Sequence, residues 1–205
     1  MLRGTKKRQA TNAAWSQRQT IQNQITALKV QVSKNKPETQ YYRSSGTIIS
    51  ATTGNEITTI PVTANLIAAS NFRDTVTGDK WSNLSLSLDT YVSADVSHLR
   101  VLIYVPKKAG NRFNPSGGTM FVSQPDKSAF WILSDKLVTL SRGYGSDDGF
   151  TAVKSKANFQ GLHTLYNSDS ATLERGEVVV QFMHNGKNEL AEQFVYGLEL
   201  SYQNK

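Results

Sequence analysis

Two stretches of the sequence alternate strictly between apolar and polar residues, and this pattern constrains the fold more than any other feature. Leucine alternates with serine from Leu84 to Leu88. Near the carboxyl terminus, apolar or aromatic residues occupy every second position from Phe194 to Tyr202. Successive side chains of a β-strand point to opposite faces, so each stretch predicts a strand with one buried face and one polar face. Such strands are typical of antiparallel sheets.

Other segments extend this prediction to about eight strands. Residues 99–105 and 178–183 are almost continuously apolar, which predicts strands covered on both faces. The further strand candidates are residues 47–50 with 57–62, 129–140, and 153–166 as one long or two shorter strands. One or two helical turns are expected within 62–70, and long loops at 106–119 and 141–149. Evenly spaced strands without alternating helices predict an all-β fold, an antiparallel sandwich or barrel.

The positive charge of the chain is concentrated in its first fifth. The 205 residues include 23 lysines and arginines and 16 aspartates and glutamates, a net charge of +7. Residues 1–45 hold nine of the basic residues and one acidic residue, Glu38, which gives this segment a net charge of +8. Residues 46–205 are nearly neutral, at −1. We therefore predict a basic N-terminal arm (1–45) and a neutral β-domain (46–205).

Within the arm, the sequence predicts a helix over about residues 12–33, because this stretch contains neither proline nor glycine. Apolar residues recur there with the spacing of a coiled-coil seam, namely Ile21, Ile25, Leu28 and Val32. A stripe this narrow favours association with copies of itself. Packing of the helix on its own domain is an equally good interpretation.

The composition of the arm is typical of a segment that binds a polyanion. Lysine and arginine side chains on a flexible segment neutralise phosphates and release counterions without needing a folded site. Trp15 adds a ring on which a base can stack. The predicted nucleic-acid-binding residues are Arg3, Lys6, Lys7, Arg8, Trp15, Arg18, Lys29, Lys34 and Lys36. A solvated tail that only aids solubility is the alternative interpretation.

The sequence offers little for catalysis or metal binding. It contains no cysteine, which excludes disulfides, thiol nucleophiles and cysteine-rich zinc sites. His98, His163 and His184 each lie in or beside a predicted strand, and none has a second histidine at metal-ligand spacing. Asp147 and Asp148 are adjacent carboxylates, but the ligand spacing of a calcium loop is missing. We predict no enzyme activity, no catalytic residue and no cofactor, and leave open a structural divalent cation. No apolar run reaches the roughly twenty residues of a membrane-spanning helix, so no membrane partner is expected.

Three strand-like segments carry a resemblance to a known family. They are 98–106 (HLRVLIYVP), 130–140 (FWILSDKLVTL) and 193–202 (QFVYGLELSY). The first is similar to the strand that follows the first long alternating strand in small viral shells. The second, with its aspartate followed by lysine, resembles a segment of the capsids of circular single-stranded DNA viruses, and the third resembles their last strand. Together with the basic arm, the chain resembles the single jelly-roll capsid proteins of small icosahedral viruses, of the circular single-stranded DNA virus or plant satellite virus type.

This resemblance implies an eight-stranded antiparallel jelly-roll sandwich of two four-stranded sheets, with the loop 106–119 around a fivefold axis. It implies a structural protein of the virion that assembles with copies of itself, about sixty in the simplest T=1 icosahedral shell. The arm would package a single-stranded genome, with DNA favoured over RNA, and assembly would take place in the host nucleus or cytoplasm. The alternative from the residues alone is a cellular β-barrel protein that binds nucleic acid through a basic tail.

Overall fold

The protein consists of two units that are described separately. The computed structural model describes residues 17–31, 37–49, 56–69, 79–92, 96–140, 151–167, 172–185 and 193–204. Internal contacts divide the chain into Met1–Glu38 and Thr39–Lys205. Strand β1 (Thr39–Ile49) begins the second unit. Residues 39–45, which their charge assigned to the arm, are therefore part of a strand. Exposed polar residues such as Arg43 and Ser45 hid this part of β1 from an analysis based on apolar patterns, whereas residues 47–49 lie in the predicted strand 47–50.

In the first unit, residues 17–31 form an α-helix. They lie within the predicted helix of about 12–33, and the rest of that prediction falls outside the described residues. The Thr26 hydroxyl donates to the Gln22 carbonyl four residues earlier at 2.9 Å, so this β-branched polar residue is accommodated within the helix. No helix in the described part of the chain is long and apolar enough to cross a bilayer.

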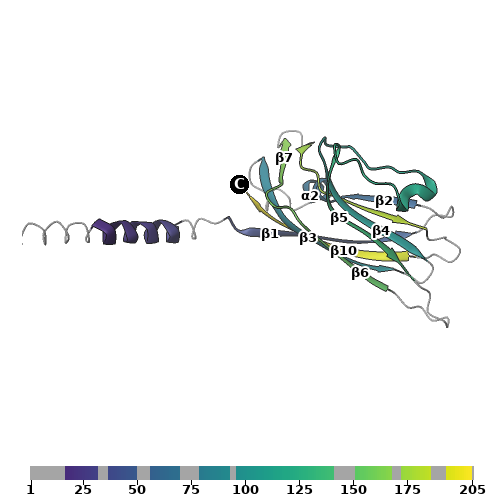
Figure 1. Ribbon diagram of the computed structural model, residues 1–205, viewed down its shortest axis with the longest axis horizontal. Helices are drawn as coiled ribbons and strands as arrows, with labels where there is room; N and C mark the ends of the chain where they lie inside the picture. Colours follow the sequence, from purple (N-terminus) through teal and green to yellow (C-terminus); the bar gives the residue numbers. More distant parts are fainter. Residues whose placement is uncertain are drawn as a thin grey trace, which may run out of the picture. The chain divides into compact units, whose positions relative to one another are not determined.

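The second unit is a sandwich of two antiparallel sheets (Figure 1). The first sheet has the strand order β1, β10 (Gln193–Asn204), β3 (Lys80–Val92), β7 (His163–Asn167) and β8 (Thr172–Arg175), with β6 (Thr151–Asn158) also paired to β3. The second sheet has the order β2 (Glu56–Pro61), β9 (Val179–His184), β4 (His98–Pro106) and β5 (Phe130–Thr139). The short helices are α2 (Val62–Ala68) and the 3-10 helix η1 (Gly117–Phe121).

The strand order is that of a jelly roll, which confirms the predicted fold. Along the chain, β1, β3, β6 and β10 lie in one sheet and β2, β4, β5 and β9 in the other. The last strand returns to pair with the first over the full length of β1, from Thr39 opposite Gln203 to Ile49 opposite Gln193. The first sheet has six strands where four were expected, because the segment 153–166 forms two strands and β8 adds a partner for β7.

The core between the sheets contains the residues that the alternation predicted, with one exception. On β10, Tyr196 is half-buried and packs against the core, and the other alternating residues are buried: Phe194, Leu198, Leu200 and Tyr202. On β3, Leu86 and Leu88 are buried, whereas Leu84 is 36% exposed. The register between β3 and β10 shifts between Ser201 and Tyr202, which leaves Leu84 without a partner residue on β10. The expectation that Leu84 shares the buried face is wrong, because an extra residue in a strand reverses the faces beyond it.

Strands β4 and β9 are buried on both faces, as their continuous apolar sequences predicted. The first sheet covers one face through the main core cluster. The segment that includes η1 covers the other face, where Met120 packs with Leu102, Tyr104 and Phe130 in a second cluster.

A buried arginine fastens this covering segment to the second sheet. Arg100 on β4 is 2% exposed. Its Nε and Nη2 atoms donate to the two carboxylate oxygens of Asp135 on β5, at 2.8 and 2.6 Å. Its Nη1 atom donates to the carbonyls of Met120 and Ser123, both at 2.7 Å. Four of the five guanidinium N–H groups are thus hydrogen-bonded, and the two bonds to the carbonyls hold the covering segment in place.

Candidate nucleic-acid interface and assembly surfaces

Two of the predicted nucleic-acid-binding residues, Arg18 and Lys29, lie in the described helix 17–31. Both side chains are exposed. At about 100° per residue, the helical period places both of them beside the line of Ile21, Ile25 and Leu28, not opposite it. The other predicted nucleic-acid-binding residues lie outside the described part of the chain: Arg3, Lys6, Lys7, Arg8, Trp15, Lys34 and Lys36.

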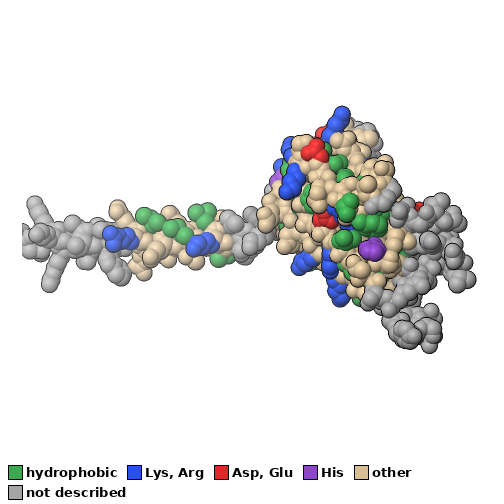
Figure 2. Space-filling view, turned by 45° about the vertical axis from the view of Figure 1, so that its right-hand side comes forward, with side chains coloured by type: hydrophobic (Ala, Val, Ile, Leu, Met, Phe, Trp, Pro, Cys, Tyr) green, Lys and Arg blue, Asp and Glu red, His purple; other side chains and the backbone are tan. Residues whose placement is uncertain are grey.

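The predicted assembly seam is an exposed apolar stripe. Ile21, Ile25 and Leu28 are 54%, 47% and 58% exposed. Figure 2 shows hydrophobic side chains along the helical segment, between lysine and arginine side chains. Val32, the fourth predicted seam residue, lies outside the described residues. A helix of this length is marginal in water when isolated, so the stripe needs a partner surface.

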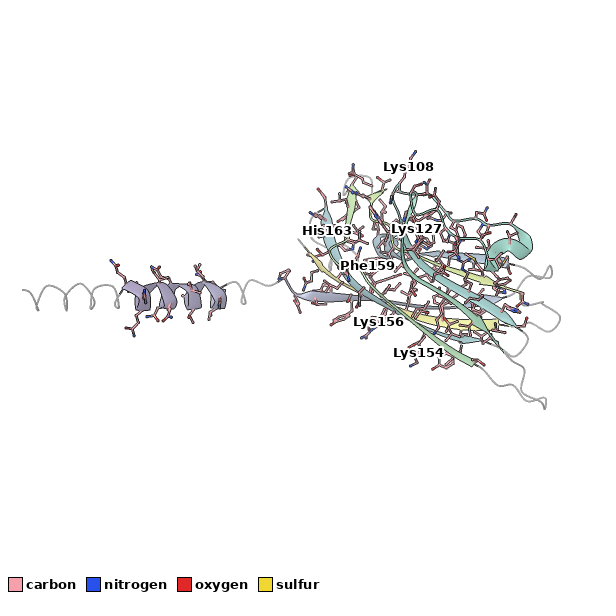
Figure 3. All side chains as sticks on the ribbon, in the orientation of Figure 1. Lys108, Lys127, Lys154, Lys156, Phe159 and His163 are labelled. Atoms are coloured by element: carbon pink, nitrogen blue, oxygen red, sulfur yellow. The ribbon has the colours of Figure 1, made fainter. Side chains whose placement is uncertain are left out.

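The body carries a basic edge that the charge analysis missed. Lys154 and Lys156 on β6 are both exposed and point to the same face, two residues apart (Figure 3). Lys136 on β5 reaches across and donates from Nζ to the Lys154 carbonyl at 2.9 Å. Asp89 lies 3.8 Å from Lys154 Nζ in a solvent-exposed pair. Lysines at alternate positions of a predicted strand could have indicated this edge. They were missed because the prediction rested on the net charge of the whole domain, which is close to zero.

The loop 106–119, expected around a fivefold axis, is anchored to the body. Arg112 donates to both carboxylate oxygens of Glu177 at 2.9 and 2.6 Å, and the Gly110 N–H donates to Glu177 at 3.1 Å. The Glu177 carboxylate raises the pKa of Arg112. The Gln181 amide donates to the Phe113 carbonyl at 2.7 Å. These contacts hold the loop in a defined conformation beside the second sheet.

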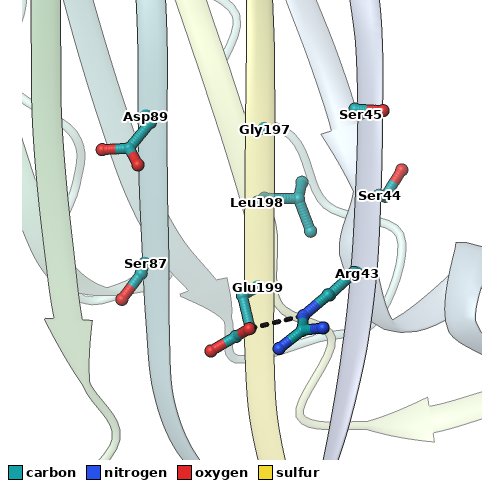
Figure 4. A pocket seen from close by; sticks show the side chains of 8 residues that line it. All are labelled: Arg43, Ser44, Ser45, Ser87, Asp89, Gly197, Leu198 and Glu199. Atoms are coloured by element: carbon teal, nitrogen blue, oxygen red, sulfur yellow. Dashed lines mark hydrogen bonds and ion pairs between the residues drawn. The ribbon is translucent and has the colours of Figure 1, made fainter.

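A shallow depression lies on the outer face of the first sheet, across β1, β10 and β3 (Figure 4). Gly197 forms its floor, and no atom lies within 4 Å of the position where a Cβ would be. Arg43 and Glu199 flank it with an ion pair of 2.6 Å. Arg43 was counted with the arm, and the structure places its charge beside a body carboxylate instead.

The histidines considered as catalytic or metal-binding candidates are not brought together. The His98 ring hydrogen-bonds to Ser97 at 3.0 Å and the His163 ring to Ser82 at 2.9 Å. His184 is fully buried, and burial lowers its pKa. No group of three histidine, aspartate or glutamate residues able to hold a metal ion occurs among the described residues. The candidate cation ligands Asp147 and Asp148 lie outside them.

No protein-family model and no curated protein matches the sequence. Solved viral structures are similar in fold at low identity. A chain from Desmodium yellow mottle tymovirus is 10% identical, with 83% of this chain and 89% of that chain covered and a TM-score of 0.45. A chain from turnip yellow mosaic virus is 9% identical, with 83% and 82% covered and a TM-score of 0.45. A chain from a 60-mer of the BFDV capsid protein is 11% identical, with 82% and 94% covered and a TM-score of 0.39. At these values, the jelly-roll assignment rests on the strand order itself.

Proposed function

We propose that this chain is a viral capsid protein, a structural protein of the virion without enzyme activity, which assembles into an icosahedral shell and packages a single-stranded genome through its arm. The proposal rests on one observation: the net positive charge lies in the first unit, and the β-sandwich of the second unit is neutral. Met1–Glu38 contains eight basic residues and one acidic residue, a net charge of +7, whereas Thr39–Lys205 contains fifteen of each. A neutral jelly roll is suited to tiling with copies of itself, and a separate cationic unit is suited to an enclosed polyanion.

The helix supports a link between assembly and genome binding. If copies of the helix associate through Ile21, Ile25 and Leu28, the same contact brings the cations beside that stripe close together. Like charges at such a seam repel each other. Phosphates bound at Arg18 and Lys29 would relieve this repulsion, so helix association and nucleic-acid binding should favour each other.

The positive charge of the arms can neutralise part of the negative charge of a genome. With about sixty copies in the simplest shell, the arms supply roughly four hundred positive charges. A single-stranded genome of kilobase size carries about one negative charge per nucleotide, on the order of a thousand or more. Divalent cations or polyamines would have to neutralise the remainder. We favour DNA over RNA as the genome, and assembly in the host nucleus or cytoplasm.

Negative-stain electron microscopy of the purified full-length chain tests the proposal, with the ratio of absorbance at 260 and 280 nm as the measure of packaged nucleic acid. We expect uniform closed particles that contain nucleic acid. The double variant Arg18→Gln/Lys29→Gln should contain less nucleic acid than the matched body variant Lys127→Gln/Arg175→Gln, which loses the same charge at two exposed residues outside the basic edge. A monomeric chain that binds nucleic acid without forming particles would contradict the capsid assignment. Equal losses in the two variants would contradict the role of the arm.

A further inference from the structure

The free edges of the two sheets differ in how well they are protected against pairing with another strand. Strand β2 is short and ends at Pro61, and β8 has four residues. Strands β5 and β6 carry exposed lysines, and the Lys136 side chain donates a hydrogen bond to the Lys154 carbonyl at the edge of β6. Short strands, proline and lysine are the usual means by which proteins prevent edge-to-edge association.

Strand β1 has one residue of this kind, the exposed Arg43, whose charge is paired with Glu199 of the same sheet. It has 11 residues, contains no lysine or proline, and pairs with β10 without a bulge. It is the terminal strand of the first sheet, so it is hydrogen-bonded to β10 on one side and to no described strand on the other. A long, regular edge strand with a single, already paired charge is a template for another strand.

Hydrogen bonds in the first sheet establish which way the main chain of each strand points. In an antiparallel sheet, the N–H and C=O groups of successive residues point alternately to the two neighbouring strands. The Ser85 N–H on β3 donates to Ser201 Oγ on β10 at 3.1 Å. The Leu84 carbonyl on β3 accepts a hydrogen bond from the Phe159 N–H, which follows β6, at 3.0 Å. The Leu84–Ser85 peptide therefore points its carbonyl away from β10 and its N–H toward β10, and the alternation then directs the odd-numbered residues of β3 from Ser85 onward toward β10.

The same alternation continues from β10 to β1. The odd-numbered residues of β10 lie opposite those of β3 over residues 195–201 and point toward them, so its even-numbered residues point toward β1. Leu198 lies opposite Ser44 and Leu200 opposite Tyr42, so the even-numbered residues of β1 bond to β10. The residues whose main-chain groups point to the free side are Tyr41, Arg43, Ser45 and Thr47. No described residue forms a main-chain hydrogen bond with them on that side.

We infer that β1 pairs antiparallel with β1 of a second copy of this chain, about a twofold axis at Ser44. This register, in which Thr39 of one copy lies opposite Ile49 of the other, overlaps all 11 residues of the strand. It joins odd-numbered residues to odd-numbered residues, as the free main-chain groups require, and forms roughly a dozen hydrogen bonds.

Charge also favours this register. Arg43 lies opposite Ser45 of the second copy, and its guanidinium is already matched by Glu199 of its own sheet at 2.6 Å (Figure 4). A shift by two residues toward the start of the strand would place Arg43 opposite Arg43, which is unfavourable for like charges. The inference rests on the edge of β1 and deepens the proposed function by assigning one contact between copies.

A single cysteine tests the twofold axis, because the native chain has none. Residues on the axis form a non-hydrogen-bonded pair with Cα atoms about 4.5 Å apart, within the range of a disulfide. Under mild oxidation, full-length Ser44→Cys should become mostly disulfide-linked dimer on non-reducing gels. The matched control is Gln40→Cys, on the same face of β1, whose cysteine would lie opposite Ile48 of the second copy. It should give at least tenfold less dimer. Equal linking in the two variants, or none in Ser44→Cys, would overturn the register.

Amide hydrogen exchange on the wild-type chain provides a second measurement that does not depend on a variant folding. The amides of Tyr41, Arg43, Ser45 and Thr47 should exchange slowly in the associated protein and at least tenfold faster after dilution to monomer. Fast exchange in both states would refute pairing at this edge. The outcome is separable from the capsid proposal. Disulfide-linked dimers without particles would support β1 pairing alone, and particles without a cross-link would support the capsid alone.

Discussion

Replacing Asp135 with alanine should destabilise the protein much more than replacing Glu199 with alanine, although both carboxylates form ion pairs of the same length. The N–O distance is 2.6 Å in the Arg100–Asp135 pair and in the Arg43–Glu199 pair. The two ion pairs differ in how deeply their side chains are buried. Arg100 is 2% exposed and Asp135 28%, whereas Arg43 is 76% and Glu199 38% exposed. An arginine left unpaired in the interior cannot recover its hydration, and an exposed one can.

The structure sets the expected magnitudes. Removing one partner of a buried ion pair costs about 3–5 kcal/mol. Because Asp135 is partly exposed, water can reach the vacated space, and we expect the lower end, about 3 kcal/mol. For the exposed pair, the expected cost of Glu199→Ala is about 0–1 kcal/mol. In a chain of this size each kcal/mol lowers the melting temperature by roughly 2–4 °C, so the expected decreases are about 6–12 °C and at most about 4 °C.

Thermal unfolding followed by tryptophan fluorescence measures both variants under identical conditions. A low protein concentration keeps association from contributing to the apparent stability. The double variant Arg100→Met/Asp135→Ala tests the cause, because it removes the buried cation together with its carboxylate partner and should be destabilised by less than the sum of the two single variants. Equal decreases for Asp135→Ala and Glu199→Ala would refute the argument that burial decides the contribution of each pair.

Two further predictions concern the seam and a buried histidine. Ile25→Asp should reduce helix order or particle yield more than Gln24→Asp, measured by circular dichroism and electron microscopy, because only the first places a charge in the apolar stripe; equal effects would contradict the seam. Burial lowers the pKa of His184, so the unfolded state binds its proton more readily, and stability should decrease as the pH is lowered through about 6.5, the ordinary pKa of histidine. Glu56 at 3.8 Å opposes this effect but does not outweigh burial. The urea midpoint of His184→Leu should change less as the pH is lowered; an unchanged pH dependence would exclude His184 as its source.

Strands were predictable where at least one face is buried and apolar, and less predictable where the exposed and half-buried residues are mostly polar. Alternation identified β10, and continuous apolar sequence identified β4 and β9, because burial selects apolar residues at those positions. Only the end of β1 was predicted, within the candidate 47–50, because most outward residues of its first part are polar and its inward residues include Ser44. The bulge that exposes Leu84 depends on pairing with a strand more than one hundred residues away, which local sequence does not encode.

In the candidate site too, features that depend on local sequence were predictable and features that depend on tertiary packing were not. The spacing of Ile21, Ile25 and Leu28 predicted a helix stripe that is exposed, since helical periodicity is a local property. The basic edge of β5 and β6 was not predicted, because Lys136 and Lys154 meet only through the packing of the two sheets. Net charge by segment also misplaced Arg43, whose partner Glu199 is 156 residues away in sequence.

The two proposed contacts between copies join different sets of chains. In the antiparallel β1 pair, the two Thr39 residues lie at opposite ends of the paired strands, about 34 Å apart at 3.4 Å per residue. The two arms of such a pair are therefore attached at points far apart, so helices associate more readily between arms of different β1 pairs. A chain with both contacts can therefore extend beyond a dimer, and loss of either contact leaves a smaller assembly. It follows that Ile25→Asp, introduced into the Ser44→Cys chain, should abolish particles while leaving the disulfide-linked dimer. Loss of the dimer as well would mean that one contact depends on the other.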